Sequence, residues 1–437
     1  VFLFALGAVF FNLFCSFVFY LGVGSQMASH FCLQYNRLRE NTMRSIQEKF
    51  QVSALDLRLM IMSIVLVAMA LAFHVATGNF LSPENLYNIA QQSAVVGIVA
   101  TAIGLVIVAR QIDLSVGSVL ATVGVAIAYL MYSRGWHWVP ASMVGLGISL
   151  AIYLYQGWLS AYLGVASFVV TLGGLVSFRG IAFLFSDGRT QPISDPTFLL
   201  IGGGLDGAIG TTASWTLGLI ASLVVLVNSF QRRRSFLSHG LAPRPLLFDF
   251  MITGFFIVVI LLFVGVMCSY QIQSKEEPQG IPNPVLIWAV VVAFISFIVN
   301  RTSFGRYIYA IGGNPEAANL VGIPVRWVTL KIYLLLGVMT TIAAMVAISR
   351  LNAGTASLGT GMELYAIAAA VIGGVALSGG SGSVLGTVLG ALIIQFLESG
   401  LLLMEVGVGQ RLVIIGQVLI VAVVFDVIYR RATGERL

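Results

Sequence analysis

The chain is built from long apolar stretches that are separated by short polar breaks. Most stretches run for about 20 residues, the length of an α-helix that crosses the hydrocarbon core of a membrane. The predicted spans are 59–77, 91–109, 114–132, 139–163, 167–186, 213–230, 249–270, 282–300, 326–348, 363–379, 383–404 and 410–430. Because glycine and proline interrupt several of them, short, re-entrant or broken segments are expected among roughly ten to twelve crossings. The sequence therefore predicts an all-α, polytopic transmembrane helical bundle.

Composition agrees with this class of protein. Hydrophobic residues make up 58% of the chain and charged residues 9%, whereas a soluble domain usually carries about 25% charged residues. A transmembrane barrel is not expected, because its strands would give alternating segments of about ten residues. The net charge of +6 comes from basic residues in short loops, the pattern that orients membrane helices. No nucleic-acid partner is indicated, and the expected surroundings are membrane lipid.

The basic residues also predict the orientation of the bundle. They cluster at residues 37–49, 231–244, 301–326 and 430–431. An even number of spans places all four clusters on one side, which the positive-inside rule makes cytoplasmic. Residues 187–212 and 271–281 then face outward, and the first of these segments is long enough to contact a soluble partner.

Residues 1–50 differ from the rest, which we treat as one transmembrane domain over 51–437. Residues 1–23 are an apolar run with no basic residue ahead of them, unlike the charged leader of a signal peptide. One interpretation is an additional membrane helix. The other is that the natural start is Met43 and that the upstream residues come from an over-extended reading frame.

Two distant segments resemble each other. Residues 117–123, Gly-Ser-Val-Leu-Ala-Thr-Val, echo residues 382–388, Gly-Ser-Val-Leu-Gly-Thr-Val, and a Leu-Ser pair precedes each of them. The echo indicates either two related halves, as in many transporters, or chance similarity among apolar residues. The sequence alone does not decide between a parallel and an inverted repeat.

No catalytic, metal or cofactor site is predicted. The sequence contains no G-x-x-x-x-G-K-[ST], no H-E-x-x-H and no Cys-x-x-Cys, so P-loop binding of ATP by this chain is not expected. Cys15, Cys32 and Cys268 lack the spacing of a metal or redox site. We expect a protein that is not itself an enzyme.

Asp113 immediately precedes an apolar run. It can cap the following helix by accepting a hydrogen bond from the backbone near Ser115, and Arg110 can pair with it if the turn is helical. The two interpretations are a structural cap with an ion pair, or a polar element of a permeation path or gate that includes Ser115 and Gly117.

Two further acidic residues lie in or near apolar spans, Glu363 and Glu398. Charges within a membrane usually face a bundle interior or water. Glu398 lies deeper in its span and is the second candidate for a gate or path residue. Glu363 either faces the interior or lies at a helix end in water.

The most polar break between two spans is residues 305–323. Asn314 is a plausible N-cap, Pro315 suits the first helical position and Glu316 suits the first turn. Gly322 can end the helix in a left-handed conformation, and Pro324 blocks its continuation. A helix of about two turns is too short to be stable alone. It either docks on a partner or is an amphipathic connector on the membrane surface.

Four motifs then carry a resemblance to a known family. They are residues 312–323, Gly-Gly-Asn-Pro-Glu-Ala-Ala-Asn-Leu-Val-Gly-Ile; 112–118, Ile-Asp-Leu-Ser-Val-Gly-Ser; 167–180, Ser-Phe-Val-Val-Thr-Leu-Gly-Gly-Leu-Val-Ser-Phe-Arg-Gly; and 369–386, with its Gly-Gly pairs. The first resembles the cytoplasmic coupling loop of ABC-importer permeases of the ribose, xylose and branched-chain amino acid group, and the others resemble further motifs of that group. The resemblance runs from about residue 55 to 430. The extra basic loop and span over 231–281 are more similar to the xylose members than to the shorter ribose members.

The resemblance implies a type II-importer-like permease in a bacterial inner (cytoplasmic) membrane. Two copies of the chain would form the translocation path, and two separate ATPase subunits would dock on its cytoplasmic side. A periplasmic sugar-binding protein would deliver a monosaccharide, for which D-xylose is the first candidate. The residues that would form the ATPase-coupling helix are Gly312, Asn314, Pro315, Glu316, Ala317, Ala318 and Gly322. The alternatives are import of ribose or another small solute, or an ion-coupled secondary transporter. The chain lacks the relay of acidic residues that is typical of the latter.

Overall fold

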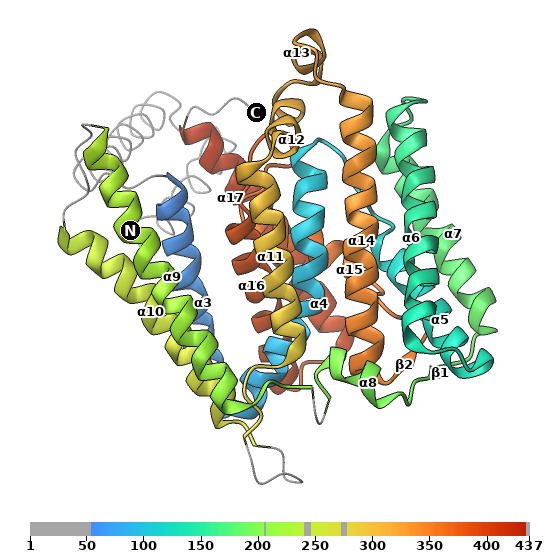
Figure 1. Cartoon of the computed structure of the whole chain (residues 1–437), viewed down its shortest axis with the longest axis horizontal. Coiled ribbons are helices and arrows are strands. Elements are labelled where there is room, and N and C mark those ends of the chain that lie inside the picture. The colour runs from blue at the N-terminus through green and yellow to red at the C-terminus, as the bar shows by residue number, and fades with distance from the viewer. Residues whose placement is uncertain (1–53, 205–206, 240–245, 272–277, 434–437) are drawn as a thin grey trace, which may run out of the picture.

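The computed structural model describes residues 54–204, 207–239, 246–271 and 278–433 (Figure 1). The segment 1–50, with its two interpretations, lies outside the described residues. The helices are α3 (Ala54–Thr77), α4 (Pro83–Val108), α5 (Val116–Arg134), α6 (Trp138–Ala161), α7 (Ser167–Ser186), α8 (Pro196–Leu199), η1 (Leu200–Gly202), α9 (Gly210–Ser238), α10 (Leu246–Ser269), α11 (Asn283–Arg301), α12 (Ser303–Gly313), α13 (Pro315–Leu320), α14 (Val325–Leu351), α15 (Met362–Ile372), α16 (Val384–Leu403) and α17 (Val408–Thr433). The strands are β1 (Gln191–Pro192) and β2 (Ala353–Gly354).

The all-α prediction is confirmed, and a helix occupies each of the twelve predicted spans. Ten helices in the described part of the chain are long and apolar enough to cross a membrane, and shorter apolar helical stretches run over Met362–Ile372 and Val408–Val421. The largest differences lie at three helix ends, of which α9 runs on to Ser238, beyond the predicted end at 230. α4 begins earlier than predicted because Ser82 Oγ caps it and Pro83 fills its first turn. α15 ends earlier because the chain turns at Gly374, which has a φ of 96°.

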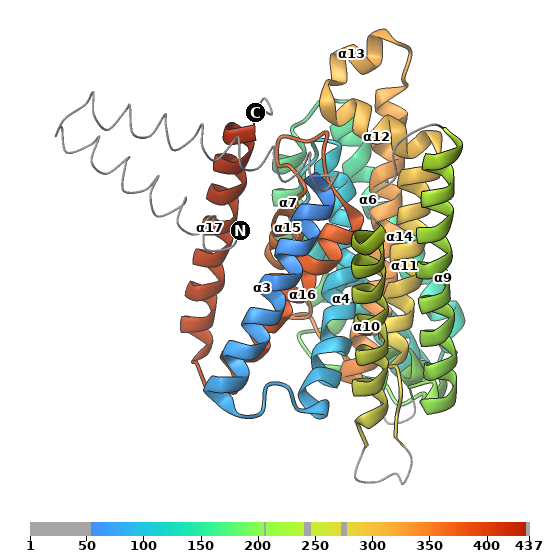
Figure 2. The same ribbon diagram turned by 90° about the vertical axis from the view of Figure 1, so that its left-hand side faces the viewer.

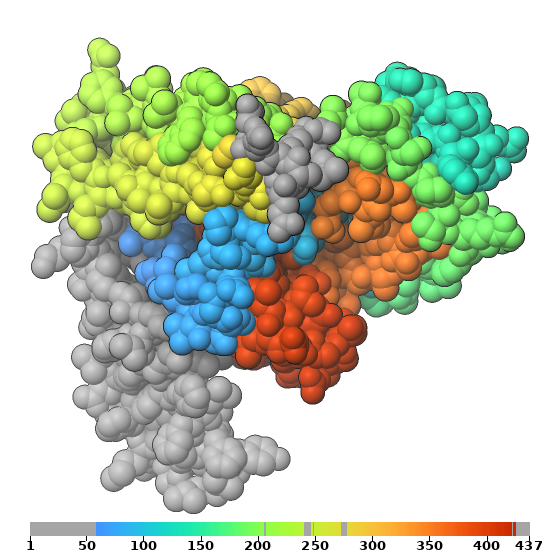
Figure 3. All heavy atoms as spheres, turned by 90° about the horizontal axis from the view of Figure 1, so that it is seen from below, coloured from blue at the N-terminus to red at the C-terminus, as the bar shows by residue number. Residues whose placement is uncertain are grey.

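Burial separates the central helices from the peripheral ones. In the most apolar window of α4, 94% of the residues are buried, against 11% in α3 and α10 and 17% in α9. α4 is therefore the axis of the bundle, with α11, α14, α15 and α16 packed around it. α9 and α10 lie together at one end, and α5, α6 and α7 lie at the other (Figures 1 and 3). The outer helices keep apolar exposed faces, as expected for surfaces that contact lipid.

One crossing is not a continuous helix. After α14, the short strand β2 pairs with β1 in antiparallel fashion, and the chain then runs beside α5 before α15 begins. Gly354 packs against Gly124 and Ala128, whereas Gly359 packs against Gly117, near the first turn of α5. β2 and the irregular residues 355–361 that follow it thus run antiparallel to α5, and α15 completes the crossing.

The connections divide between the two ends of the bundle. One side carries α13, the C-terminal end of α9, the N-terminal end of α10 and the C-terminal end of α17 (Figures 1 and 2). The other side carries α8 and the β1–β2 pair. Three of the four basic clusters therefore share one side, as predicted. The fourth, residues 37–49, lies outside the described residues.

The two segments of the echo open α5 and α16. The amide of Gly380, shortly before α16, donates to the carbonyl oxygen of Val108, shortly before α5, at 2.9 Å. Both helices therefore begin near the side that carries α13, and they run in the same direction. The interpretation as two related halves stays a prediction.

Candidate functional site

α13 projects beyond the body of the bundle, on the side that carries the basic loops (Figures 1 and 2). Its N-cap is Asn314, whose Oδ1 accepts hydrogen bonds from the amides of Glu316 and Ala317, both at 3.0 Å. Pro315 occupies the first position, and Gly322 has a left-handed φ of 85°. The capping pattern predicted from the sequence is confirmed at every one of these positions.

Two residues of the predicted coupling set are buried, Gly312 on α12 and Ala318 on α13. Ala318 is only 4% exposed and packs against the bundle, whereas Glu316 and Ala317 are exposed. The largest apolar surfaces are Leu320, 86% exposed, and Val321, 77% exposed. Sequence analysis did not single out these two residues, although apolar side chains at the tip of a polar break are a recognisable pattern.

α12 forms the base on which α13 stands. Thr302 caps α12 by accepting from the amide of Gly305 at 3.2 Å. From the same helix, the hydroxyl of Tyr309 donates to the carbonyl oxygen of Gly382 at 2.9 Å. Burial raises the pKa of Tyr309 above its ordinary value, so the phenol keeps its proton and remains a donor. α12 is thereby tied to the loop that precedes α16.

Arg110 supplies a second tie, and here the sequence prediction was wrong. Its side chain does not pair with Asp113 but donates from Nε to the carbonyl oxygen of Gly312 at 2.7 Å and from Nη2 to that of Gly313 at 2.8 Å. The backbone of Arg110 is left-handed, with a φ of 61°, so the turn is not helical. The pairing that a helical turn would have allowed is therefore lost.

Gly312 also makes the closest backbone approach at this junction. A Cβ atom on Gly312 would collide with the carbonyl oxygen of Val108 and with the backbone of Gly380. Only glycine lets the end of α12 lie directly on the end of α4, at Val108, and on the loop before α16, at Gly380. The base of α13 is thus held by close backbone packing as well as by hydrogen bonds.

Asp113 is fully buried and lies in the chain segment that connects α4 to α5. Its Oδ1 accepts from the amide of Ser115 at 2.7 Å and from the hydroxyl of Ser115 at 2.6 Å, and its Oδ2 accepts from the hydroxyl of Tyr153 at 3.1 Å. The predicted hydrogen bond to the backbone near Ser115 is confirmed. However, Ser115 itself is the residue that precedes the first turn of α5, so Asp113 supports the entry to the helix from two residues earlier.

The network continues from Asp113 into α6 and α14. Gln156 donates to the hydroxyl of Ser115 at 2.9 Å, and the hydroxyls of Tyr153 and Thr340 lie 3.3 Å apart. Sequence analysis missed this part of the site. A signal was present, because α6 carries polar residues at helical spacing on one face. They are Ser149, Tyr153, Gln156 and Ser160.

The remaining candidates divide between two places. Gly117 lies against the carbonyl oxygen of Gly359 and the carboxylate of Glu363, so it joins the region of Asp113 and Ser115. Glu363 is buried in the first turn of α15 and does not lie in water. Glu398 is on α16 within electrostatic range of Arg350 and Arg411. The structure therefore groups three of the four predicted path residues and places Glu398 elsewhere.

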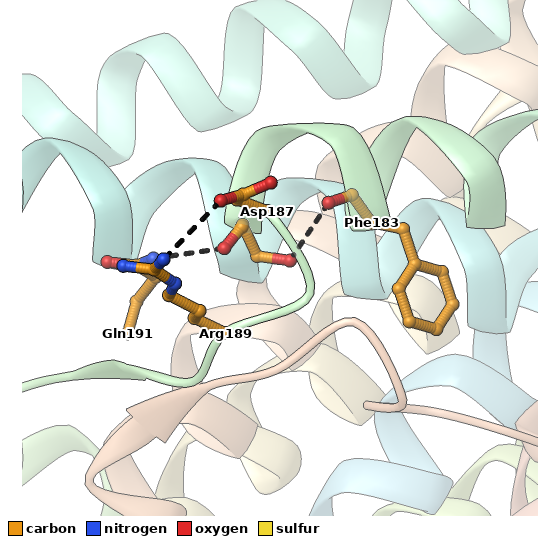
Figure 4. Close-up of polar contacts among 5 residues, drawn as sticks. Phe183, Asp187, Arg189 and Gln191 are labelled. Atoms are coloured by element: carbon orange, nitrogen blue, oxygen red, sulfur yellow. Dashed lines mark hydrogen bonds and ion pairs between the residues drawn. The ribbon is translucent and has the colours of Figure 1, made fainter.

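The segment after α7, which the sequence predicts to face outward, carries exposed charged residues at its tip. Asp187 and Arg189 form an ion pair with a separation of 3.8 Å, and their side chains are 88% and 82% exposed (Figure 4). Such pairs contribute little to stability. Asp195 caps α8 by accepting from the amides of Thr197 and Phe198. The tip offers charged, solvated groups on the side opposite α13.

Among the described residues, ten helices long and apolar enough to cross a membrane, with an interrupted crossing and a capped helix outside them, define a multi-pass membrane protein. The family model described as "Branched-chain amino acid transport system / permease component" matches residues 85–423. The chain belongs to this permease family, as the four motifs indicated. Permease components of this kind are transport proteins of the bacterial inner membrane, not enzymes, and work with separate ATPase and solute-binding partners.

Curated relatives cover most of the chain. The xylose transport system permease protein XylH of Haemophilus influenzae is 37% identical over 86% of this chain and 98% of its own length. The protein of the same name from Escherichia coli K12 is 35% identical over 86% of this chain and 93% of its own length. The ribose import permease protein RbsC of Escherichia coli K12 is 30% identical over 80% of this chain and 87% of its own length. No solved structure matches the chain.

Proposed function

We propose that this chain is the permease that carries D-xylose into the cytoplasm. The support comes from the relatives that bear the name of a xylose permease, which share 35–37% of their residues with the chain over 86% of its length. The helical pair α9 and α10, with the basic loop between them, also agrees with the resemblance to the xylose members. Ribose is the second candidate, since ribose permeases are 30% identical over 80% of the chain.

The observation that carries the coupling role is the exposed tip of α13. Leu320 and Val321, at the end of a helix that projects beyond the bundle, are 86% and 77% exposed. Exposed apolar side chains that lie together mark a contact with a protein or a membrane, and we favour the protein because α13 extends away from the apolar spans. We assign this face to the groove of an ATPase subunit. The assignment includes the outward-facing predicted residues Glu316 and Ala317.

The remaining predicted residues of this set support the helix rather than touch the partner. Asn314 and Pro315 start it, Gly322 ends it, and Gly312 and Ala318 seat it on the bundle. ATP hydrolysis belongs to the separate subunit in this proposal, because the sequence has no G-x-x-x-x-G-K-[ST].

Coupling requires that α13 acts on the core. Arg110 clamps the end of α12, and three residues further on Asp113 contacts Ser115, the N-cap of α5, and Tyr153 on α6. A displacement of α13 by the ATPase would thus reach helices that line a path. A partner can shift a two-state equilibrium only through contacts that differ between the states, and these contacts are suited to that task.

Asp113, Ser115 and Gly117 are assigned to the gate in this scheme, and Glu398 to a separate polar cluster. A second copy of the chain completes the path, lipid surrounds the peripheral helices, and a periplasmic sugar-binding protein delivers the solute to the outer face. In the domain division, residues 51–437 form the permease, and residues 1–50 are a segment outside it.

Uptake by the reconstituted transporter tests the proposal. The chain is co-reconstituted into liposomes with an ATPase subunit and a sugar-binding protein of the same transport system, and uptake of labelled xylose and ribose is followed with and without ATP. We expect ATP-dependent uptake of xylose that a variant ATPase unable to hydrolyse ATP does not support. A preference for ribose would reassign the sugar. Uptake driven by a proton or sodium gradient without ATP would overturn the importer mechanism.

A further inference from the structure

The irregular segment after β2 has an unusual composition for its position. Residues 355–361 read Thr-Ala-Ser-Leu-Gly-Thr-Gly, with three hydroxyl side chains and two glycines. Ser357 and Thr360 are exposed and Thr355 is half-buried, while Ala356 and Leu358 face the bundle. One side of the segment is therefore a polar strip on the surface of the molecule.

The strip lies at the depth of the membrane-spanning helices. Gly359 packs against Gly117 and Leu120 of α5. From α7, Arg179 donates through Nη1 to the carbonyl oxygens of Ala356 and Leu358, both at 2.7 Å. Because Arg179 lies in the middle third of α7, the strip cannot be a loop at the outer water surface.

Lipid is a poor environment for such a surface. Non-helical backbone at membrane depth is tolerated only where it is buried in protein or lines a water-filled cavity. Arg179 satisfies two of the carbonyl groups. Among the hydroxyl side chains of the strip, Thr355 Oγ1 and Ser357 Oγ lie 3.1 Å apart, and Thr360 Oγ1 donates to the carbonyl oxygen of Ser357 at 2.6 Å. Each hydroxyl still has lone pairs that can accept a further hydrogen bond.

An orphan acceptor lies directly behind the strip. Within the described part of the chain, the buried Oε2 atom of Glu363 has no hydrogen-bond partner, and it lies against Gly117, which also contacts Gly359. A buried acceptor without a donor is unfavourable, and such a group calls for an explanation such as a water or a ligand. Water or a solute hydroxyl that enters along the strip would supply the missing donor.

We propose that residues 355–361 line the aqueous route of the transported solute and present the hydroxyls of Thr355, Ser357 and Thr360 to a polyhydroxylated ligand of pentose size. This inference rests on the proposed function for the identity of the solute, but the exposure of the strip to water does not. A few hydroxyls give weak, exchangeable hydrogen bonds, which suit a route from which the sugar must leave again.

Cysteine accessibility tests the route. Cys15, Cys32 and Cys268 are replaced by alanine, and Ser357→Cys and Thr360→Cys are introduced singly. The matched control is Leu219→Cys on α9, which is 59% exposed and surrounded by apolar residues on a peripheral helix. The assembled transporter is placed in lipid nanodiscs, which leave both faces accessible, and its reaction with a membrane-impermeant maleimide is followed. A thiol must ionise to react, so a cysteine in lipid reacts slowly.

We expect both strip cysteines to react at least about tenfold faster than the control cysteine, because only water lets the thiolate form. In proteoliposomes, attachment of the maleimide should block the uptake of labelled xylose that each variant shows before labelling. Rates no faster than that of the control would mean that the strip faces lipid or a dry contact with a second copy, and would overturn the proposal. Unchanged uptake after complete labelling would overturn it as well. Fast labelling in a protein that imports no sugar would instead refute the proposed function and leave the water-lined strip standing.

Discussion

Arg110 and Gly312 are 202 positions apart in the chain, yet the Nε atom of Arg110 donates to the carbonyl oxygen of Gly312 at 2.7 Å. The last carbonyl groups of a helix have no partner within it and carry a partial negative charge. A guanidinium that spans two of them, at Gly312 and Gly313, is therefore well matched to the end of α12. Arg110, just after the end of α4, thus holds the base of α13 in place.

We expect Arg110→Ala to reduce the number of sugar molecules imported per ATP hydrolysed by about tenfold, because hydrogen bonds to a charged group are each worth about 1.5–3 kcal/mol. Without the clamp, α13 can move without moving the α4–α5 connection. The measurement is xylose uptake and phosphate release in the same proteoliposomes.

The control for this variant is Arg306→Ala, which removes an exposed positive charge from α12 itself. It should leave the ratio of uptake to hydrolysis close to that of the parent protein. Arg110→Lys should give an intermediate ratio, because an ammonium group cannot reproduce the planar fork that spans two carbonyls. If Arg110→Ala and Arg306→Ala behaved alike, the clamp would have no part in coupling.

The face of α13 predicts where an ATPase subunit binds. Lysine at Glu316 and Ala317, or aspartate at Leu320, should lower co-purification of the ATPase about tenfold or more, since central contacts of an interface are each worth about 2 kcal/mol or more. The permease should remain inserted in the membrane. Ala318 is left unchanged because it packs against the bundle. Asp187→Lys, on the opposite side, serves as the control, and unchanged transport in the α13 variants would refute the docking role.

How far the sequence predicts this structure depends on the range of the interactions. The spans follow from apolar length, and the ends of α13 follow from local capping by Asn314 and Gly322, so both were predicted. The partner of Arg110 was not, because it depends on a left-handed backbone at residue 110 and on a contact across 202 positions. No local pattern carries that information.

The difference between local and long-range interactions also explains which parts of the site could be predicted. That Asp113 supports the entry to α5 was predictable from two neighbouring residues, whereas its contact with Tyr153 requires α6 to pack beside that entry. The position of residues 353–361 beside α5 could not be predicted from the sequence either. The segment lies between two predicted spans and has the glycine and hydroxyl content of an ordinary loop. Only packing shows that it runs within the bundle.

Asp113 should stabilise the junction of α5 and α6. We expect Asp113→Asn to lower the free energy of unfolding by about 1–3 kcal/mol, because an amide cannot accept all the hydrogen bonds that the buried carboxylate accepts. Tyr153→Phe should cost about 1 kcal/mol. Thermal unfolding of the purified protein in detergent measures both. The matched control is Tyr155→Phe, at a residue 57% exposed on the same helix, and an equal loss there would argue against the network.

The orientation of the bundle predicts which cysteines an impermeant reagent can reach. In a background without Cys15, Cys32 and Cys268, Ser238→Cys at the end of α9 should be labelled only when the cytoplasmic face is open. Asp187→Cys, after α7, should be labelled in intact cells, because it lies on the opposite side (Figure 1). Labelling of Ser238→Cys from outside would reverse the orientation that the positive-inside rule assigns.

The cap of α13 gives a prediction in which a single side-chain oxygen is at stake. Asn314 Oδ1 accepts two amide hydrogen bonds in a helix of only six residues, so Asn314→Ala should destabilise α13 by about 1 kcal/mol. That loss corresponds to about fivefold weaker binding of the ATPase subunit, since 1.4 kcal/mol is a factor of ten. Asn314→Asp and Asn314→Ser keep a capping oxygen and should bind like the parent protein. Titration of the ATPase subunit onto the permease in nanodiscs measures the difference. Equal affinities for the alanine and serine variants would mean that the ATPase does not recognise α13 as a folded helix.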